Sequence, residues 1–467
     1  PKNGVKVVII GAGVAGLQAA LELWRKGFEV IVLERAEKLS PLGDFFTITP
    51  SALTTLKEYP SMHADYHRNI YDCSIHVFTP SGTPIHSTVP EWKRPEVTTA
   101  APDIDISFLK RRPVFAQMQL DQVNRLDIPV HWGDKVISVL EKDDSVAVTT
   151  DSGRVFIADL CIGADGIGSS IPGFEAGPEV AIQDSGYAVA RVAFPRNAIK
   201  KGSPASKLLH NVDVKPEFRT YVGNDHHLIL FLTPDWVAFT LTHPDHHGAK
   251  ESWNNLKSPT ELTQYLSGGD WDPAVLDFVQ SSSSSVVDWK LRWRDGARQW
   301  TSESGRLIRI GDSAHAFLPT AGNGAVQGLE DAISLAECLR IGGKKDLTYA
   351  TKVHNTLRFE RVSILQQTGF LNREELHSVD LDTIKDAPKN ASIGFFKIGR
   401  WVWNHNPEFY AMENYESCRT HIFEGKLGNF KNTNIPPGHV YQPWSLESEA
   451  KRMQAGISSN LKQNGDW

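Results

Sequence analysis

The sequence is poor in cysteine and has no large excess of either charge, and these two shortages exclude several classes of protein. The 467 residues include only four cysteines, Cys73, Cys161, Cys338 and Cys418. Their wide separation lacks the spacing of metal ligands and favours a reducing compartment, so we expect a cytoplasmic protein without a metal site. The 49 basic and 55 acidic residues give a net charge of −6, which makes neither nucleic acid nor an anionic membrane an evident partner.

Long apolar runs are also missing. Residues 393–402 form the longest apolar stretch near the end, but this stretch contains Lys397 and Arg400 and is too short to span a bilayer. No apolar leader precedes the first predicted strand, so we expect no signal peptide. There is no internal repeat, and the length is sufficient for two or three domains.

The beginning of the chain contains the pattern strand, glycine turn, helix and strand. The apolar run at residues 6–10 ends at a G-x-G-x-x-G turn made by Gly11, Gly13 and Gly16. Gly11 allows the sharp reversal, Gly13 lets a pyrophosphate approach the backbone, and Gly16 lets the next helix pack closely on the strand. The amino end of that helix attracts phosphate groups, so the unit predicts a dinucleotide site.

An acidic residue ends the second strand of this unit. Glu34, followed by Arg35, lies about twenty residues beyond the glycines, where a carboxylate accepts hydrogen bonds from an adenosine ribose. Because Glu34 would repel a 2′-phosphate, the pattern predicts FAD or NAD rather than NADP. The alternative is a βαβ unit with a tight turn and no ligand.

A second glycine-rich stretch lies at residues 311–332, GDSAHAFLPTAGNGAVQGLEDA. It begins where an apolar run ends, at Asp312, whose carboxylate could bind ribityl hydroxyls. Gly322 and Gly324 then open a long helical pattern that begins near Ala325. The amino end of this helix would face the pyrimidine edge of a flavin, where negative charge grows on reduction.

These stretches, together with LER, PLGD and TPSAL at residues 33–53, resemble the class A FAD-dependent aromatic monooxygenases. That group includes salicylate and para-hydroxybenzoate hydroxylases, and the chain looks most like its fungal members that act on indole alkaloids. The resemblance covers residues 5 to about 410. It implies an α/β fold with a Rossmann-like FAD domain, an interleaved β-sheet domain for the substrate, and a C-terminal helical region. The predicted boundaries are 1–70, 105–180 and 296–345 for the FAD domain, 71–104 and 181–295 for the substrate domain, and 346–467 for the helical region and tail.

The resemblance also assigns two further flavin contacts. An arginine at the start of the helix after residue 111 reaches the flavin ribityl or pyrophosphate in the family, and Arg112 matches it best; a solvated basic helix start is the alternative. Asp165 matches an aspartate–glycine motif that touches the pyrophosphate side of FAD and has been linked to nicotinamide binding. The arginine that usually follows this motif is absent, since Gly168 and Pro172 occupy the matching positions.

For the reaction, the resemblance points to Arg191 and Asp44 as catalytic residues. Arg191 interrupts an apolar strand, and a charge there needs a partner or a function; a salt bridge at a sheet edge is the alternative. We expect Arg191 to bind the substrate or protonate an opening epoxide, and Asp44 to hold an indole N–H or a cation. Phe231 occupies the place of the tyrosine with which phenol-hydroxylating members hold a phenolate, and Tyr221 is a weaker substitute.

The family chemistry implied is reduction of FAD by NADH or NADPH, formation of a C4a-hydroperoxide from O₂, and oxygen transfer to an electron-rich aromatic substrate. No second G-x-G-x-x-G occurs, so the nicotinamide is expected to bind transiently. The alternatives are a phenol or salicylate hydroxylase, and a flavin-binding reductase or redox interaction module. Five histidines that cluster in the sequence lack the cysteine or acid that would complete a metal site: His226, His227, His243, His246 and His247.

Overall fold

The structure is a computed structural model. It describes residues 3–41, 43–68, 70–167, 169, 182–223, 225–245, 248–252, 254–267, 269–282, 286–377, 399–425 and 430–467. The helices are α1 (Val14–Arg25), α2 (Pro60–His67), α3 (Arg112–Arg125), α4 (Pro259–Tyr265), α5 (Pro273–Gln280), α6 (Asp312–His315), α7 (Gly324–Gly342), α8 (Leu347–His377), α10 (Arg400–Trp403), α11 (Pro407–Glu424) and α12 (Leu446–Gln454).

The strands fall into four sheets. They are β1 (Lys6–Ile10), β2 (Glu29–Glu34), β3 (Phe45–Thr47), β4 (Ser74–Phe78), β5 (Pro84–Thr88), β6 (Leu109–Arg111), β7 (Val130–Trp132), β8 (Val136–Glu141), β9 (Val146–Thr150), β10 (Val155–Ala158), β11 (Leu160–Gly163), β12 (Ile182–Pro195), β13 (Glu217–Gly223), β14 (His226–Leu232), β15 (Trp236–Pro244), β16 (Leu256–Lys257), β17 (Val286–Arg294) and β18 (Leu307–Arg309).

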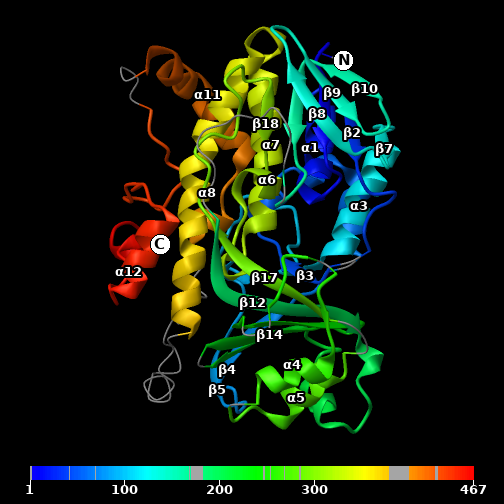
Figure 1. Cartoon of the computed structure of the whole chain (residues 1–467), viewed down its shortest axis with the longest axis vertical. Helices are drawn as coiled ribbons and strands as arrows, with labels where there is room; N and C mark the ends of the chain where they lie inside the picture. The colour runs from blue at the N-terminus through cyan, green and yellow to red at the C-terminus, as the bar shows by residue number, and fades with distance from the viewer. Residues whose placement is uncertain are drawn as a thin grey trace.

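A five-stranded parallel sheet forms the half of the molecule that contains the N-terminus (Figure 1). Its strand order is β18-β11-β1-β2-β7, and every neighbouring pair is parallel. The central strand β1 is apolar and buried over Val7–Ile10 because helices cover one face of this sheet and the three-stranded sheet β10-β9-β8 covers the other, which is why the run lacks the alternation of a half-exposed strand. Helix α1 packs on both α7 and α3. This is the α/β arrangement predicted for the flavin half.

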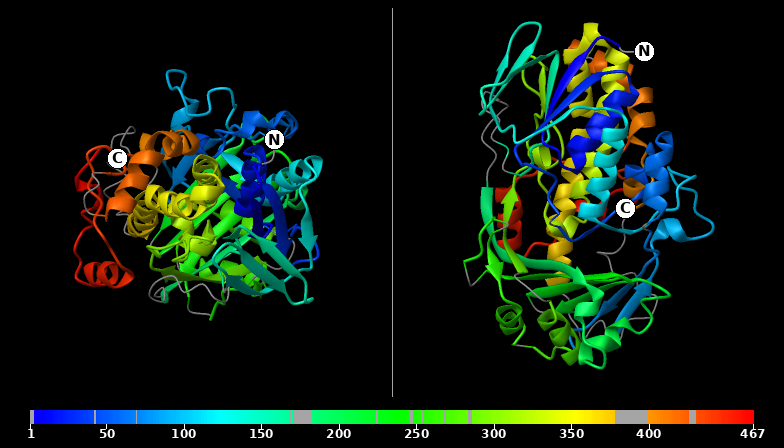
Figure 2. Two further views of the ribbon diagram at one scale, coloured as in Figure 1. Left: turned by 90° about the horizontal axis from the view of Figure 1, so that it is seen from above. Right: turned by 90° about the vertical axis from the view of Figure 1, so that its right-hand side faces the viewer.

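An eight-stranded sheet forms the other half, with the order β16-β17-β12-β15-β14-β13-β4-β5. All its pairs are antiparallel except β13 with β4. One face packs into the core cluster shared with the flavin half, and the other packs into a separate cluster with α4 and α5. Figure 2 shows this sheet as a layer across the end of the parallel sheet and its helices. Side chains that alternate along each strand therefore point either toward the flavin half or away from it.

The C-terminal region is helical. Helix α8, with 31 residues, runs along both halves of the molecule, and α11 and α12 lie on the same side of it (Figure 1). The short helix α10 lies between α8 and α11 in the sequence. Strands β4 and β5 belong to the segment 71–104, which was predicted to join the substrate domain, and they lie in the same sheet as β12–β17. The residue boundaries proposed for the three parts stay a prediction. Among the described residues, no helix combines the length and the apolar character that crossing a bilayer requires.

The sequence predicts a strand over residues 130–140 and the start of a helix within residues 51–57, and both predictions are wrong. Residues 130–140 do not form one strand, because Gly133, with φ +74°, breaks the run and sends β7 and β8 to different sheets. Residues 51–57 do not begin an α-helix; the chain makes two short 3₁₀ turns, Pro50–Ala52 and Leu56–Glu58, before α2 begins at Pro60. A proline at the first helical position suits the start of α2, since its missing N–H would have no helical partner there.

Candidate flavin and substrate site

The predicted flavin residues gather at one edge of the parallel sheet. Glu34 ends β2, Gly11 follows β1, Asp165 follows β11, and Asp312 follows β18, and these four strands are neighbours in the sheet. All four strands run the same way, so these residues lie at their carboxyl ends. This is the edge at which open parallel sheets bind dinucleotides.

The first glycine turn has the shape predicted for each glycine. A Cβ atom at Gly11 would lie 2.4 Å from the Ala164 oxygen, and one at Gly16 would lie 2.0 Å from the Gly11 oxygen. Backbone packing therefore excludes a side chain at both positions. A Cβ atom at Gly13 would meet no atom within 4 Å. The turn thus leaves open space beside the backbone at Gly13, where a pyrophosphate is predicted to bind.

Glu34 holds this turn from the neighbouring strand. One carboxylate oxygen accepts a hydrogen bond from the Ala12 N–H at 2.8 Å, and the other accepts one from the Ala36 N–H at 2.8 Å. A carboxylate can accept further bonds at each oxygen, so these contacts are compatible with a ribose ligand. The exposed Arg35 follows Glu34, and its charge opposes the rise that burial causes in the pKa of the Asp165 carboxyl.

Asp165 presents a buried oxygen beside the turn. Among the described residues, its Oδ1 atom has no hydrogen-bond partner. Burial raises the pKa of the Asp165 carboxyl, although hydrogen bonds and the charges of Arg309 and Arg35 act in the opposite direction. A buried polar atom without a partner is costly, so this oxygen fits a ligand that donates a hydrogen bond. Gly168 and Pro172 lie outside the described residues.

The second glycine turn approaches both Asp312 and the end of β3. Gly322 has φ +62°, and its oxygen accepts a hydrogen bond from Thr47 Oγ1 at 2.8 Å. A Cβ atom at Gly324, the first residue of α7, would lie 3.8 Å from Asp312 Oδ1. The start of α7, including Ala325, therefore lies beside the Asp312 carboxylate. Thr47 joins this turn to β3, the strand that follows Asp44, a contact that no sequence pattern indicated.

Of the three consecutive basic residues 110–112, Arg112 lies beside Gly43, in the loop that precedes β3. Lys110 is buried and donates from Nζ to the carbonyl oxygen of Tyr66 at 2.8 Å. The Arg111 guanidinium lies 3.5 Å from the centre of the Trp236 ring. Arg112 is exposed at the start of α3, and a Cβ atom at Gly43 would lie 3.3 Å from its Cβ and Cδ atoms. The choice of Arg112 for the flavin stays a prediction.

The two predicted catalytic residues lie close together. Arg191 Nη1 is 3.9 Å from Asp44 Oδ2, and the side chains are 22% and 12% exposed. Arg191 comes from β12, which lies between β17 and β15, so its ion pair with Asp44 is not at a sheet edge. The catalytic role of the two residues stays a prediction. The Arg112 N–H donates to the Asp44 carbonyl oxygen at 2.9 Å. Asp44 is thus fixed by the start of α3 while its side chain faces the substrate sheet.

Aromatic rings lie on the same face of the sheet as Arg191. Phe231 stacks on Phe45, with ring centres 5.6 Å apart and an angle of 9° between the rings. Tyr221 is buried in the opposite cluster, where it stacks on Phe78. Tyr221 cannot replace the family tyrosine beside Arg191, because the strand alternation directs it to the other face. Phe45 was not selected from the sequence.

No metal site is apparent. In the part of the chain that the structure describes, no three His, Cys, Asp or Glu side chains gather as metal ligands would. His243 instead pairs with Asp288 at 3.0 Å, and both side chains are at most 1% exposed. His246 and His247 lie outside the described residues.

Comparison with known proteins identifies the group. The family model described as FAD dependent oxidoreductase matches residues 6–41. The FAD-dependent monooxygenase mdpD of Emericella nidulans is 36% identical over 100% of this chain and 91% of its own length. The chain belongs to the fungal FAD-dependent monooxygenases. A monooxygenase of Claviceps purpurea is 34% identical to this enzyme, over 100% of the chain and 94% of its own length.

Solved structures with the same fold include CtdE in complex with FAD and substrate 4 and a salicylate hydroxylase substrate complex. The first has a TM-score of 0.81 and 24% identity, and it covers 90% of this chain and 100% of its own. The second has a TM-score of 0.67 and 23% identity, with coverage of 87% and 97%. The predicted family, α/β fold, FAD cofactor and enzymatic nature are therefore confirmed.

The residues of this enzyme fit FAD. The open space at Gly13, the buried Asp165 oxygen and the row of strand ends suit a dinucleotide. The residues predicted to hold it, which stay a prediction, form three sets: the first turn with Gly11, Gly13, Gly16, Glu34 and Arg35; the loops with Arg112 and Asp165; and the second turn with Asp312, Gly322, Gly324 and Ala325. When bound, the flavin supplies the redox chemistry, while the protein orients the reactants and excludes water.

Proposed function

We propose that this monooxygenase uses NADH or NADPH and O₂ to hydroxylate or epoxidise an electron-rich polycyclic aromatic substrate, with an indole as the preferred ring. The observation that carries the proposal is the Arg191–Asp44 pair beside the stacked rings of Phe45 and Phe231. Both rings are buried, at 5% and 6% exposed, so they would make the protein behind the pair apolar, and the ion pair offers both a donor and an acceptor.

The two members of the pair would have different roles. The Asp44 carboxylate can accept a hydrogen bond from an indole N–H and can stabilise a developing cation. The Arg191 guanidinium can donate to an oxygen atom that the reaction introduces, which would assist opening of an epoxide. Phe231 cannot donate a hydrogen bond to a phenolate, which favours an indole over a simple phenol.

A phenol or salicylate hydroxylase is the second candidate. It is favoured by Arg191, whose guanidinium could bind a carboxylate or phenolate by itself. A panel of paired substrates separates the two: an indole with its N-methyl analogue, and a hydroxynaphthalene with salicylate. We expect the indole to stimulate NAD(P)H oxidation most, and N-methylation to weaken this effect at least about tenfold, because Asp44 loses its donor.

Incorporation of isotopically labelled dioxygen tests the oxygenase reaction itself. A monooxygenase places one labelled oxygen atom in the product for each NAD(P)H consumed. A reductase or a redox interaction module would oxidise NAD(P)H without labelling any aromatic product. That result, across the whole panel, would contradict the proposed reaction.

A further inference from the structure

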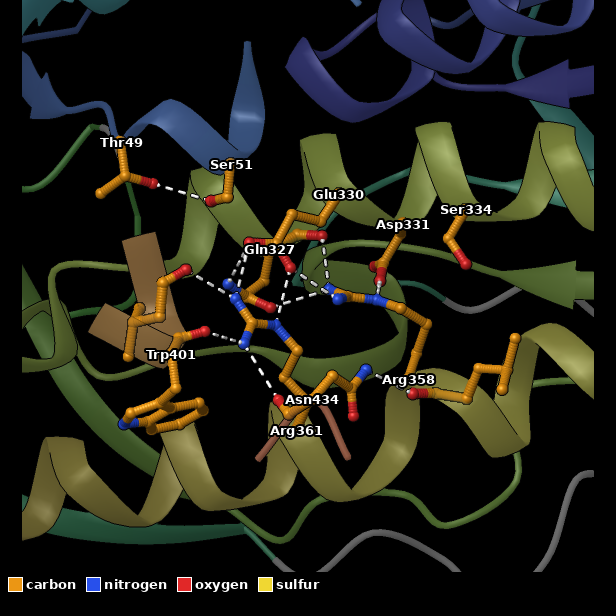
Figure 3. A network of polar contacts seen from close by, with 12 residues as sticks. Thr49, Ser51, Gln327, Glu330, Asp331, Ser334, Arg358, Arg361, Trp401 and Asn434 are labelled. Carbon is orange, nitrogen blue, oxygen red and sulfur yellow. Dashed lines mark hydrogen bonds and ion pairs between the residues drawn. The ribbon is translucent and has the colours of Figure 1, made fainter. Parts of the chain in front are cut away.

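A cluster of buried charges joins α7 and α8 (Figure 3). Arg358 of α8 donates from Nε to Asp331 Oδ1 at 2.9 Å and from Nη1 to Glu330 Oε2 at 2.6 Å. The three side chains are at most 1% exposed. Buried ion pairs are often no better for stability than apolar side chains of similar volume, so their presence favours a role in fixing geometry.

The second oxygen of Asp331 holds the turn that carries Asp312. Asp331 Oδ2 accepts a hydrogen bond from the Gly311 N–H at 3.0 Å and lies 2.5 Å from His315 Nε2. Gly311 precedes Asp312 and His315 follows it within α6. One carboxylate therefore fixes the backbone before Asp312 and the side chain after it. The turn has little conformational freedom while Asp331 stays in place.

The ionised form of Asp331 is maintained by its surroundings. Burial by itself would raise the pKa of this carboxyl, but the charges of His315 and Arg358 lower the pKa well below its usual range. Both oxygens can then act as acceptors at once. An asparagine would keep one acceptor and present an NH₂ group at the other position, toward either Arg358 or the turn.

Arg361 lies one turn further along α8 but serves another part of the chain. It donates to Glu330 Oε2 at 2.9 Å and to the carbonyl oxygens of Trp401, Val402 and Asn434 at 2.7 to 3.1 Å. Figure 3 shows the two arginines pointing from α8 toward α7, with Arg361 beside Trp401 and Asn434. The structure thus offers two equally buried arginines, of which only Arg358 contacts Asp331.

We propose that Asp331 and Arg358 are positioning residues that set the Gly311 turn so that the Asp312 carboxylate can bind the flavin. The inference rests on the proposed contact between Asp312 and the ribityl chain. Arg358 orients Asp331, Asp331 orients the turn, and the turn presents Asp312 beside the start of α7. Neither positioning residue needs to touch the flavin.

The test compares Asp331→Asn and Arg358→Lys with Arg361→Lys. FAD is titrated into each apoprotein, with quenching of flavin fluorescence as the signal, and amide hydrogen exchange is followed in the peptide that contains Gly311. We expect the FAD dissociation constant to rise at least about tenfold for Asp331→Asn and Arg358→Lys, with faster exchange at the turn. For Arg361→Lys we expect a lower melting temperature but a dissociation constant within about twofold of the parent.

A second control uses the buried His243–Asp288 pair of the substrate sheet. Asp288→Asn breaks a similar histidine–aspartate contact and should leave FAD affinity unchanged. The proposal is overturned if Asp331→Asn and Arg358→Lys bind FAD like the parent, or if both controls weaken FAD equally. Should Asp331→Asn not fold, Arg358→Lys decides, since it retains the charge. Loss of oxygenation with all these affinities as expected would contradict the proposed reaction and not the positioning role.

Discussion

Arg191 and Asp44 meet across the junction of the two halves, with Nη1 and Oδ2 3.9 Å apart. Arg191 projects from an interior strand of the eight-stranded sheet, whereas Asp44 belongs to the loop that joins β2 to β3. The Asp44 backbone is held by the first N–H of α3. The pair therefore forms only when both halves are folded against each other, and it lies beside the rings expected to contact the substrate.

Arg191→Ala should keep the flavin but lose most of the reaction. We expect product formation to fall at least tenfold, a barrier increase of about 1.4 kcal/mol, because the guanidinium no longer donates to the substrate oxygen. Flavin absorbance per protein should not change. Product is measured by mass spectrometry under saturating NAD(P)H. Arg191→Lys is the matched control, which keeps the charge and loses the planar fork. Equal turnover in Arg191→Ala and the parent would remove Arg191 from the mechanism.

Elements that are recognised from neighbouring residues could be predicted from the sequence. A strand, glycine turn, helix and acid in succession predicted the position of Gly13 and Glu34, and the second glycine stretch predicted α7. Contacts between distant segments were not predictable, because no local pattern encodes which side chains meet across domains. The Thr47–Gly322 hydrogen bond and the Phe45–Phe231 stack are of this kind.

Gly13→Val should give a folded, colourless protein. A Cβ atom at this position meets nothing within 4 Å, and Gly13 has φ −77°, so the folded chain tolerates a side chain there. The valine would instead occupy the space predicted for the pyrophosphate. We expect an apoprotein melting temperature within about 3 °C of the parent and no flavin absorbance after soaking with FAD.

Gly16→Val provides the contrast. Its Cβ atom would lie 2.0 Å from the Gly11 oxygen, so α1 must move away from β1. We expect this variant to be poorly soluble or to melt much earlier than Gly13→Val. Normal flavin absorbance in Gly13→Val would show that the pyrophosphate binds elsewhere.

Lys110 should make stability depend on pH. The residue is 2% exposed, and burial lowers the pKa of its side chain from 10.5 to about 7, because the buried ammonium loses hydration. Below pH 7 both the folded and unfolded states carry the proton, and the folded state bears the full cost. Between about pH 7 and 10.5 the unfolded state binds more protons, so this residue makes stability rise with pH.

Lys110→Met removes the contribution of Lys110 to the pH dependence of the free energy of unfolding. The variant should be more stable than the parent at pH 6 by about 1 to 3 kcal/mol, which is less than the full cost of charging Lys110 because the hydrogen bond to Tyr66 is also lost. The difference should shrink as the pH rises toward 10. Urea unfolding of both proteins from pH 6 to pH 10 measures it. A difference that stays constant over this range would contradict the lowered pKa.

Arg361→Leu should destabilise the C-terminal region strongly. The variant leaves Glu330 with one of its two arginine partners and leaves the carbonyl oxygens of Trp401, Val402 and Asn434 without their donor. Removing one partner from a buried ion pair costs about 3 to 5 kcal/mol.

Glu447→Gln is the control, because Glu447 and its partner Lys451 are both 72% exposed, and we expect no measurable change there. Thermal unfolding of both variants, combined with limited proteolysis to locate the first cleavage, measures the effect. If Arg361→Leu melted with the parent and stayed resistant to protease after residue 399, the buried cluster would not be what attaches the C-terminal segment to α8.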